Sequence, residues 1–491
     1  MKRSLLFVAL CLVIILPGTL FAFPTVFPHG TTIYKPDKCF SGYTILTTKG
    51  NQTILIDMNG NVVKHWPNVC DEEHPAKMLP NGYVMGATGK RGRLWHHPGS
   101  NDLSVVDWDG NIVWTYKKAG VHHDFQREGN PVGYYVPGME PYLDRGKTLI
   151  LSHKVVKNRK ISDKKLYDDL IVEVDYNGKV IFEWLASDHI KEMGFDRLAR
   201  IVMYRYPNYA MTRTRGVIGG DWIHVNTASW LGPNKWYDKG DERFHPDNII
   251  YDGRQTNTTG IIDRKTGKIV WHLGPDFEST RALRKLGPTI GLHHAHMIPK
   301  GLPGEGNILI FDNGGYGGYG APNPSAPYGI NNVKRDYSRV IEINPITLKV
   351  IWEYSANKAG YRDKYKFYSD YVSSAQRLPN GNTLITEGSL GRIFEVTPKC
   401  ETVWEYISPY YSKTENFNLV YRAYRVPYDY VPQLKKPVET PVIPPDNSLL
   451  RVHHLKTGQP ETMKGAAEVE AKGKMKEAEE EESGPQALPA Y

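Results

Sequence analysis

LPNGNTLITEGSLGRIFEVTPKCETVWEY, residues 378–406, contains the pattern that decides the fold of this chain. After the turn sequence PNG comes a short strand-like run, TLITE. Two further runs, GRIFEV and ETVWEY, alternate apolar and polar residues across a short turn, which is typical of a β-hairpin. Together with the residues before Leu378, the stretch predicts a unit of four antiparallel strands.

The same plan recurs along the chain, so it is a repeat. The other copies cover residues 43–66, 79–116, 149–184, 248–273 and 307–354. Each copy ends in apolar alternation with an aromatic residue, usually after an NG, DG or TG turn. Six such units predict an all-β, six-bladed β-propeller, in preference to a long β-sandwich or a solenoid.

The first copy, residues 43–66, lacks the innermost strand of the unit. The segment LVYRAYRV at 419–426 follows the sixth copy and has strand character. We expect it to complete the first blade, because joining both chain ends in one blade closes the ring and leaves no free edge.

Composition agrees with this fold class. Of the 491 residues, 40% are hydrophobic and 23% are charged, which is enough apolar surface for a real core. The 46 glycines and 34 prolines favour many turns between short strands. The net charge of +8 comes from scattered basic residues, without an arginine-rich arm or helix. We therefore expect no nucleic-acid partner, and an anionic small substrate suits the mildly positive surface.

Four parts are expected along the chain. Residues 1–22 have the basic start and the apolar core, Leu5–Leu16, of a secretory signal peptide, with an uncleaved anchor as the alternative. A short N-terminal segment, 23–40, precedes the propeller at 41–432. Residues 433–491 are proline-rich and then charged and of low complexity, and we expect a disordered tail or a short helix there. The mature protein is expected outside the cytoplasm and away from the membrane.

Three cysteines remain after the signal, Cys39, Cys70 and Cys400. In an oxidising compartment they predict one disulfide and one remaining thiol. Cys39 precedes the second strand of the first blade and Cys400 lies in the last turn of the sixth, so both belong to the same end of adjacent blades. We prefer Cys39–Cys400 to Cys39–Cys70, with three free thiols as the alternative. The chain has no CxxC pair, which argues against a thiolate metal site.

Histidines recur at one position of the repeat, the start of the innermost strand. The residues found there are His74 in the second blade, His122 and His123 in VHHDFQ, His224 in DWIHVN, His293, His294 and His296 in GLHHAHMIP, and Ser373 and Ser374 in the sixth blade. Because the innermost strands surround the central channel, these side chains are expected to converge at its mouth. A single histidine is usually structural, but four blades in one register favour a functional site. His153 and His245 lie outside this register and are expected to be structural.

Arg254, in NIIYDGRQTNTTG, lies on or near the second strand of the fourth blade, within reach of His224. A guanidinium beside histidines lowers their pKa and keeps them neutral. It also binds a tetrahedral oxyanion through charge-assisted hydrogen bonds. The alternative is a surface arginine paired with a carboxylate.

These motifs resemble the bacterial aryl-sulfate sulfotransferases. The resemblance lies in VHHDFQ, DWIHVN, NIIYDGRQTNTTGIIDRKTGKIVWHLG and GLHHAHMIP with GNILIFDNGG, and it spans roughly residues 24–432. It implies an exported six-bladed propeller that transfers a sulfuryl group from an aryl sulfate to a phenol, without a nucleotide sulfate donor or other cofactor. The implied partners are small aryl sulfates and phenols, in the periplasm or outside a bacterial cell.

The resemblance also implies roles for four residues. The family's histidine nucleophile falls on His293, which would carry the group as a sulfohistidine. His224 and Arg254 fall on positions that bind the sulfuryl oxygens. His123 falls on the third-blade histidine, to which we assign the proton transfers, as acid and then as base.

Two features depart from the family pattern. Many members have an acidic residue after the nucleophile, where this chain has His294, so His294 is the alternative nucleophile. Well-known members also have a larger N-terminal domain with dimer contacts, whereas the segment 23–40 is short, so the oligomeric state stays open.

Two other classes of protein are compatible with these residues. The channel histidines, with Asp124, would suit a divalent cation in a metal-dependent propeller lyase or hydrolase. A propeller whose mouth holds a ligand or a protein partner would be a binding protein without catalysis. Tyr316, Tyr319 and Trp230 are candidates to line the mouth in either case. The resemblance favours the sulfotransferase, for which no metal ligands are expected.

Overall fold

The computed structural model of the chain describes residues 29–49, 52–70, 74–89, 101–208, 219–412 and 417–444. The expected signal peptide and the charged part of the tail lie outside the described residues. Within the described ranges, no helix has the length and apolarity that crossing a membrane requires.

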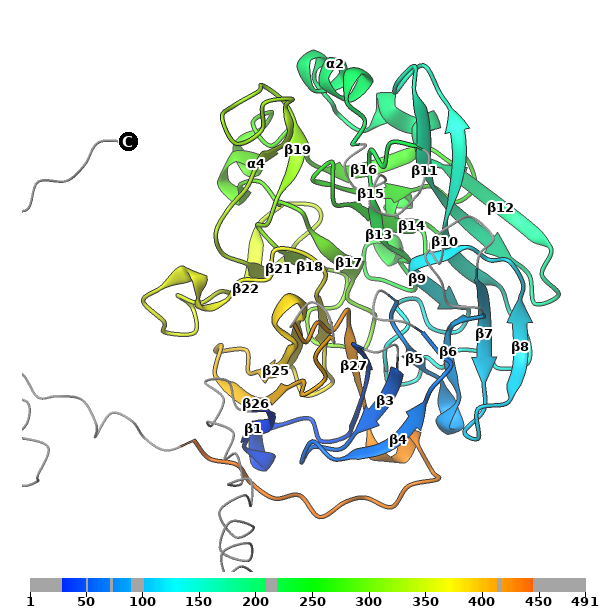
Figure 1. Cartoon of the computed structure of the whole chain (residues 1–491), viewed down its shortest axis with the longest axis vertical. Coiled ribbons are helices and arrows are strands. Elements are labelled where there is room, and N and C mark those ends of the chain that lie inside the picture. Colours follow the sequence, from blue (N-terminus) through cyan, green and yellow to red (C-terminus); the bar gives the residue numbers. More distant parts are fainter. Residues whose placement is uncertain are drawn as a thin grey trace, which may run out of the picture. The chain divides into compact units, whose positions relative to one another are not determined.

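Six antiparallel sheets surround a common axis (Figure 1), which confirms the predicted six-bladed propeller. The innermost strands of blades one to six are β27 (Ala423–Val426), β5 (Lys77–Met78), β9 (Val121–Arg127), β13 (Val225–Trp230), β17 (His293–Met297) and β23 (Ser374–Arg377). The second strands are β2 (Tyr43–Thr48), β6 (Val84–Thr88), β10 (Thr148–Lys157), β14 (Ile249–Gly253), β18 (Ile308–Asp312) and β24 (Thr383–Glu387). The third strands are β3 (Gln52–Ile56), β7 (Asp102–Val106), β11 (Lys165–Val174), β15 (Thr258–Ile262), β21 (Arg339–Ile343) and β25 (Arg392–Val396). The fourth strands are β4 (Val62–Trp66), β8 (Ile112–Tyr116), β12 (Val180–Leu185), β16 (Ile269–Leu273), β22 (Val350–Tyr354) and β26 (Thr402–Ile407).

Additions to this plan lie in the loops of blades three to five. Helix α2 (Arg197–Arg205) follows the third blade, and α4 (Arg281–Leu286) follows the fourth. Asp196 caps α2, since its side chain accepts a hydrogen bond from Ala199 N. A small hairpin of β19 (Gly317–Tyr319) and β20 (Ile330–Val333) is inserted within the fifth blade.

The two chain ends close the ring in the first blade, as predicted. Strand β27 pairs antiparallel with β2, from Tyr43 opposite Val426 to Leu46 opposite Ala423. In Figure 1 the two strands lie side by side although they come from opposite ends of the sequence. The split blade leaves neither chain end as a free inner edge.

One tryptophan in the fourth strand of each blade joins it to the next blade. Its indole N–H donates to a backbone carbonyl of that neighbour, at 2.8–3.4 Å in all six cases. The pairs are Trp66 with Asp107, Trp114 with Tyr176, Trp184 with Gly267, Trp271 with Pro345, Trp352 with Pro398 and Trp404 with Met58. The tryptophan near the end of each repeat therefore has a structural role, because an indole N–H removed from water needs an acceptor. The sixth bond returns to the first blade and closes the circle.

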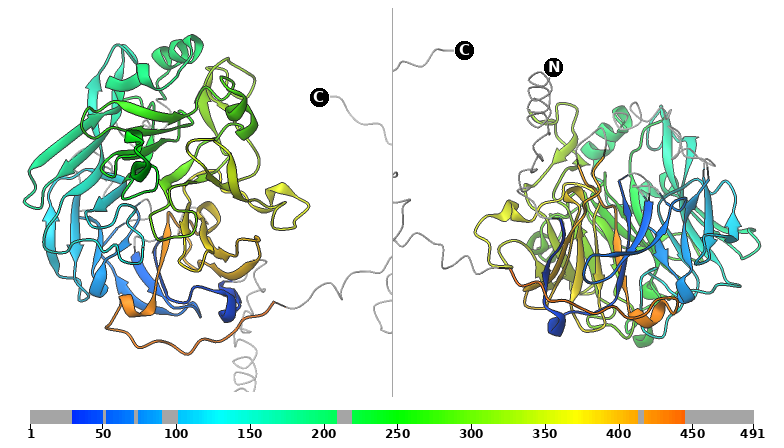
Figure 2. Two further views of the ribbon diagram at one scale, coloured as in Figure 1. Left: turned by 180° about the vertical axis from the view of Figure 1, so that it is seen from behind. Right: turned by 60° about the horizontal axis from the view of Figure 1, so that its bottom comes forward.

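Both flanking segments pack on the propeller. Strand β1 (Gly30–Tyr34) pairs with β26, so the sixth blade has a fifth strand that the sequence did not predict. Tyr34 also forms an isolated bridge with Val442. The proline-rich segment before Val442 runs along the outside of the first and second blades (Figure 2). There the Gln433 amide donates to Asn81 O at 2.7 Å. The described start of the tail, up to residue 444, is thus extended chain bound to the blades.

Cys39 and Cys400 are both thiols that form no disulfide, so the preferred Cys39–Cys400 disulfide was wrong for this structure. The two residues do belong to neighbouring elements, but their side chains face different partners. The Cys39 thiol lies 3.3 Å from Val403 O, whereas the Cys400 thiol lies 3.4 Å from Glu353 O in the fifth blade. Burial raises the pKa of both thiols, that of Cys39 to about 12.

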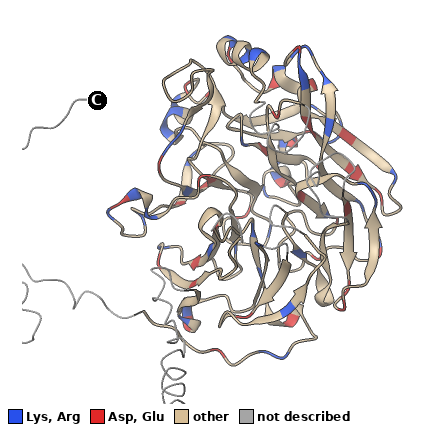
Figure 3. Cartoon of the chain, viewed as in Figure 1, with Lys and Arg blue, Asp and Glu red and all other residues tan. Residues whose placement is uncertain are grey.

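Charged residues of both signs are interspersed over the blades in the view of Figure 3. This agrees with the scattered basic residues in the sequence. The more informative charges are buried around the axis, where they surround the histidines.

Candidate functional site

Three histidines in or directly before the innermost strands have an unusual backbone. His123, His224 and His294 have φ of 57°, 53° and 54°, in the left-handed region. The pairing register of β9, β13 and β17 with their neighbours also shifts close to these residues. A left-handed conformation costs a non-glycine residue about 1–2 kcal/mol. Such strain persists where the surrounding structure imposes it, commonly at functional sites.

The structure brings together the four residues expected to form the site, His123, His224, His293 and Arg254, here called the histidine cluster. The rings of His123 and His224 lie 5.1 Å apart. The backbone N–H of Arg254, directly after β14, donates to His224 O at 3.0 Å. This hydrogen bond holds Arg254 next to the fourth-blade histidine. Positive charge on Arg254 and on His224 lowers the pKa of His293. Residues 123, 224, 254 and 293 thus meet from three different blades.

Arg254 is a buried cation without a carboxylate partner among the described residues. The residue is 3% exposed, its Nε has no hydrogen-bond partner among the described residues, and no described carboxylate forms a salt bridge with it. The guanidinium instead lies over the ring of Tyr316, 4.6 Å from the centroid. A buried charge needs a partner. The alternative of a surface arginine paired with a carboxylate is therefore wrong, and the arrangement suits an anionic ligand.

His293 is held as a single neutral tautomer. Its Nδ1 lies 2.8 Å from Asn313 Oδ1 and 3.0 Å from Gly291 O. The Asn313 amide nitrogen donates to two carbonyls, of Ser369 and Val372, so its oxygen must face the histidine. Both neighbours of Nδ1 are acceptors, and Nδ1 therefore carries the proton.

The lone pair of His293 is consequently on Nε2. Nε2 accepts the Val372 N–H at 3.1 Å. Burial, followed by the positive charge of Arg254, holds the pKa of His293 well below its ordinary value. The ring is neutral at physiological pH, which is the form that can attack an electrophile.

We expect Asn313→Leu to slow modification of His293 by about 10–100-fold, since the leucine cannot hold the Nδ1–H. The rate of sulfuryl labelling by an aryl sulfate, followed by intact mass, measures this directly. Thermal unfolding of the same sample serves as the control for the fold. An unchanged labelling rate in a folded variant would contradict this role of Asn313.

His224 is oriented by Asp221, three residues earlier in DWIHVN. Asp221 Oδ2 lies 2.6 Å from His224 Nδ1. The carboxylate accepts a hydrogen bond from Nδ1–H and leaves Nε2 as the atom that can meet a ligand. When Nε2 also carries a proton, it can donate a hydrogen bond to an oxyanion.

His294 and His296 point away from the histidine cluster. The ring nitrogens of His294 lie 3.0 Å from Ala375 O and 3.3 Å from the Tyr424 hydroxyl. Those of His296 lie 2.9 Å from His294 O and 3.0 Å from the Tyr134 hydroxyl. Burial lowers the pKa of both rings, that of His296 to about 4. His293 and His294 are therefore separated by direction, although they are adjacent in sequence.

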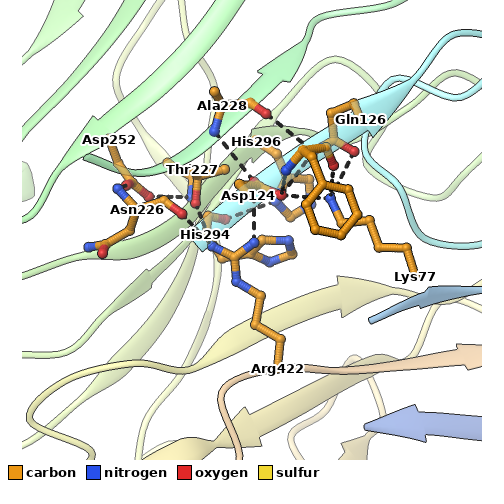
Figure 4. Close-up of polar contacts among 12 residues, drawn as sticks. Lys77, Asp124, Gln126, Asn226, Thr227, Ala228, Asp252, His294, His296 and Arg422 are labelled. Carbon is orange, nitrogen blue, oxygen red and sulfur yellow. Dashed lines mark hydrogen bonds and ion pairs between the residues drawn. The ribbon is translucent and has the colours of Figure 1, made fainter. Parts of the chain in front are cut away.

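Beside these rings lies a central charge network of Lys77, Asp124, Gln126 and Arg422 (Figure 4). Asp124 accepts from Lys77 Nζ at 2.6 Å and lies 3.2 Å from Arg422 Nη1. Lys77 also bonds Gln126, and Arg422 also bonds Asn226 O. Burial lowers the pKa of Lys77 to about 8. Asp124 is occupied by two cations, so it is not open to the metal ion that the lyase or hydrolase interpretation required.

Asp124→Asn should destabilise the protein by about 3–5 kcal/mol, because it leaves Lys77 and Arg422 as buried cations without a counter-ion. Lys77→Met should cost less, since the pair of Asp124 and Arg422 remains. Urea unfolding of both variants at neutral pH gives the comparison. Equal urea midpoints for the two variants would show that the Asp124 carboxylate does not balance the charges of both Lys77 and Arg422.

Some expected mouth residues lie elsewhere. His74 is buried with Nε2 2.9 Å from Val121 O, outside the histidine cluster. Trp230 ends β13 at the opposite end of that strand from His224, where its indole donates to Glu173 at 2.6 Å, so its predicted place at the mouth was wrong. Tyr319 is buried with its hydroxyl on Trp222 O. Of the three expected aromatic residues, Tyr316 alone meets the cluster, through Arg254.

Sequence reasoning missed three residues of the site. Asn313 and Asp221 belong to the motifs FDNGG and DWIHVN, so polar residues next to the motif histidines were the feature that could have identified them. Tyr421 lies in the closing segment, and its ring stacks on His123 with centroids 5.4 Å apart. Its hydroxyl is buried and, among the described residues, has no hydrogen-bond partner. Only the ring closure brings Tyr421 to the site.

Comparison with known proteins identifies one family. Residues 139–425 match the arylsulfotransferase (ASST) family, a range that contains His224, Arg254, His293 and Asn313. His123 lies outside the matched range. No curated protein matches the chain.

Similar solved structures are distant. A protein of unknown function from Bacteroides caccae is 10% identical with a TM-score of 0.41, over 79% of this chain and 99% of that one. A streptogramin B lyase is 12% identical with a TM-score of 0.35, over 79% and 84%. The virginiamycin B lyase from Staphylococcus aureus is 11% identical with a TM-score of 0.34, over 78% and 84%.

Proposed function

Because the chain belongs to the arylsulfotransferase family, we propose that it transfers a sulfuryl group from an aryl sulfate to a phenol through a sulfohistidine on His293. One observation carries the proposal. A buried guanidinium without a carboxylate partner among the described residues, Arg254, lies beside a neutral histidine whose Nε2 holds the lone pair. A sulfate ester fits both groups. Its oxygens accept hydrogen bonds from the guanidinium, and its sulfur is the electrophile for the Nε2 lone pair.

In the first half-reaction, His293 Nε2 gives up the hydrogen bond from the Val372 N–H and attacks the sulfur of the aryl sulfate. The N–S bond forms while the bond from sulfur to the phenolic oxygen breaks, and that oxygen leaves with the electron pair. His123, as acid, gives it a proton. The Nδ1 proton stays on the hydrogen bond to Asn313, so the modified ring remains electron-poor and releases the group readily.

The three sulfuryl oxygens gain negative charge in the transition state. Arg254 provides donors for them, and so does His224 when Nε2 carries a proton as well as Nδ1. The Val372 N–H, which lies 3.1 Å from Nε2, is in reach of the same oxygens once the sulfur occupies the lone pair. Stabilisation of this kind does not depend on the identity of the aryl group, which suits a transferase for several phenols.

In the second half-reaction, an acceptor phenol takes the place of the first. His123, now a base, accepts its proton, the phenolic oxygen attacks sulfur, and the N–S electron pair returns to Nε2. No nucleotide donor or metal ion enters this scheme. We further propose that the protein acts in the periplasm or outside a bacterial cell, on the basis of the signal-like sequence at residues 1–22.

The test is to incubate the protein with a chromogenic aryl sulfate, first alone and then with an added phenol. Donor alone should yield one sulfuryl group per chain by intact mass, and continued release should require the phenol. Release into water without a phenol would identify a sulfatase instead. If the protein is not labelled and the donor is not cleaved, the protein is a binding propeller without this activity.

A further inference from the structure

A second cluster of side chains lies in the third blade, behind the histidine cluster. His122, His153 and Asp169 come from the neighbouring strands β9, β10 and β11, and His153 and Asp169 are direct partners in the sheet. Their side chains are 1%, 4% and 0% exposed. The reaction proposed above uses none of them.

The spacing of these groups matches a metal coordination sphere. Asp169 Oδ1 lies 3.1 Å from His122 Nε2 and 3.4 Å from His153 Nε2. The two imidazole rings are stacked with centroids 3.5 Å apart. Ligand atoms at 2.0–2.1 Å from a tetrahedral zinc ion are about 3.3 Å from one another. Two imidazoles and one carboxylate are also a recurrent ligand set for divalent transition metals.

The surroundings are rich in uncompensated negative charge. Asp169 is joined in the interior by Asp168 and Asp221, and in the described ranges no lysine or arginine pairs with any of the three. The Asp169 carboxylate is completely buried, and besides the two imidazole rings its polar neighbours are the backbone N–H groups of Val225 and His224. A buried carboxylate in this condition is costly unless a cation reaches it. Burial and the charge of Asp221 raise its pKa well above the ordinary value in the absence of a metal.

We propose that His122, His153 and Asp169 bind one divalent transition-metal ion, with zinc as the best match to the ligand set. The site joins three strands of the third blade and fixes β9 at the residue that precedes His123. Its role is to position that strand, because the His122 ring lies 5.1 Å from the ring of His123 and the transfer proposed above uses none of the three ligands.

Binding requires two local changes. The lone pair of each Nε2 lies in its ring plane, so the nearly parallel rings, now 12° from each other, must tilt apart to share an ion. His122 Nε2 must also give up its 3.0 Å contact with Ser152 O. The remaining coordination position is left for water.

The test uses full-length protein without a histidine tag, stripped with a chelator and dialysed against Zn²⁺ alone. We expect one zinc per chain in the wild type and in the control His272→Gln, whose histidine is in a partly exposed part of β16. Asp169→Asn and His153→Gln should each lose the metal. Co²⁺ added to stripped wild type should give the visible absorption of a coordinated, low-symmetry ion, and the same addition to Asp169→Asn should not.

Wild-type protein that takes up neither Zn²⁺ nor Co²⁺ would overturn the proposal and leave a proton-sharing group of two histidines and an aspartate. This outcome does not depend on whether a variant folds, because it needs only the wild type. Sulfuryl labelling of stripped protein tests the transferase separately, so failure of one proposal is distinguishable from failure of the other.

Discussion

Replacing His293 by asparagine is expected to abolish sulfuryl transfer, with a loss of about 10⁴-fold or more. Asparagine is of similar size to the inner part of the imidazole, but it has no nitrogen lone pair that can attack sulfur. The mass added to the wild type by donor alone should be absent from the variant. The two measurements together separate a lost nucleophile from a merely weakened site.

The matched control is His294→Asn, next along the strand. His294 faces Ala375 and Tyr424 rather than Arg254, so its loss should affect packing and leave the labelling of His293 in place. A mass addition that persists in His293→Asn and disappears in His294→Asn would reverse the assignment. That outcome would make the residue that departs from the family pattern the carrier.

Arg254→Gln is expected to lower kcat/KM by about 10²–10³-fold, the usual effect of removing one preorganised donor from a developing anion. Most of the loss should appear in the first half-reaction, in which the sulfuryl oxygens gain charge. Arg243→Gln is the control, because Arg243 is exposed and paired with Asp241 at 2.7 Å. Equal rates for the wild type and Arg254→Gln would remove Arg254 from the anion site.

The same variant should change the pH dependence in a defined direction. Neutral His293 is the reactive form, and its pKa lies well below the ordinary value because of burial and then the charge of Arg254. Wild-type labelling should therefore persist as the pH falls through about 6.5, where a free histidine becomes protonated. Without Arg254 the pKa rises, although burial still lowers it, so the acid loss moves to higher pH. A loss of activity at the same pH in both proteins would show that another group controls the acid limb.

Much of the fold was predictable because its determinants are local and repeated. Alternation with a period of two specifies strands, the NG and DG turns specify hairpins, and six copies of one unit specify the number of blades. The tryptophan that joins each blade to the next was also visible, because it ends its copy at Trp66 and Trp184 and stands two residues before the end in the other four copies. The closure of the ring by residues 419–426 followed from the one unit that lacked an inner strand.

The additions at the chain ends were not predictable in the same way. Strand β1 and the segment before residue 444 have no repeat partner, and the strand edges that they cover exist only in the folded ring. The free thiols have the same cause. Cys39 and Cys400 are close in topology, but the direction of each side chain depends on packing between blades.

What the sequence determined by itself was the fold and the identity of the cluster, since His123, His224 and His293 occupy repeat positions that any propeller brings to its axis. What only the tertiary structure decided was which atoms face one another. It directed His293 toward Arg254 and His294 toward Tyr424, fixed the His293 tautomer through Asn313, and left Arg254 without a carboxylate partner among the described residues. The physical reason is that the alternation of residues along a strand already sets its register. The direction of a side chain at a bulged, left-handed residue depends instead on contacts from other blades.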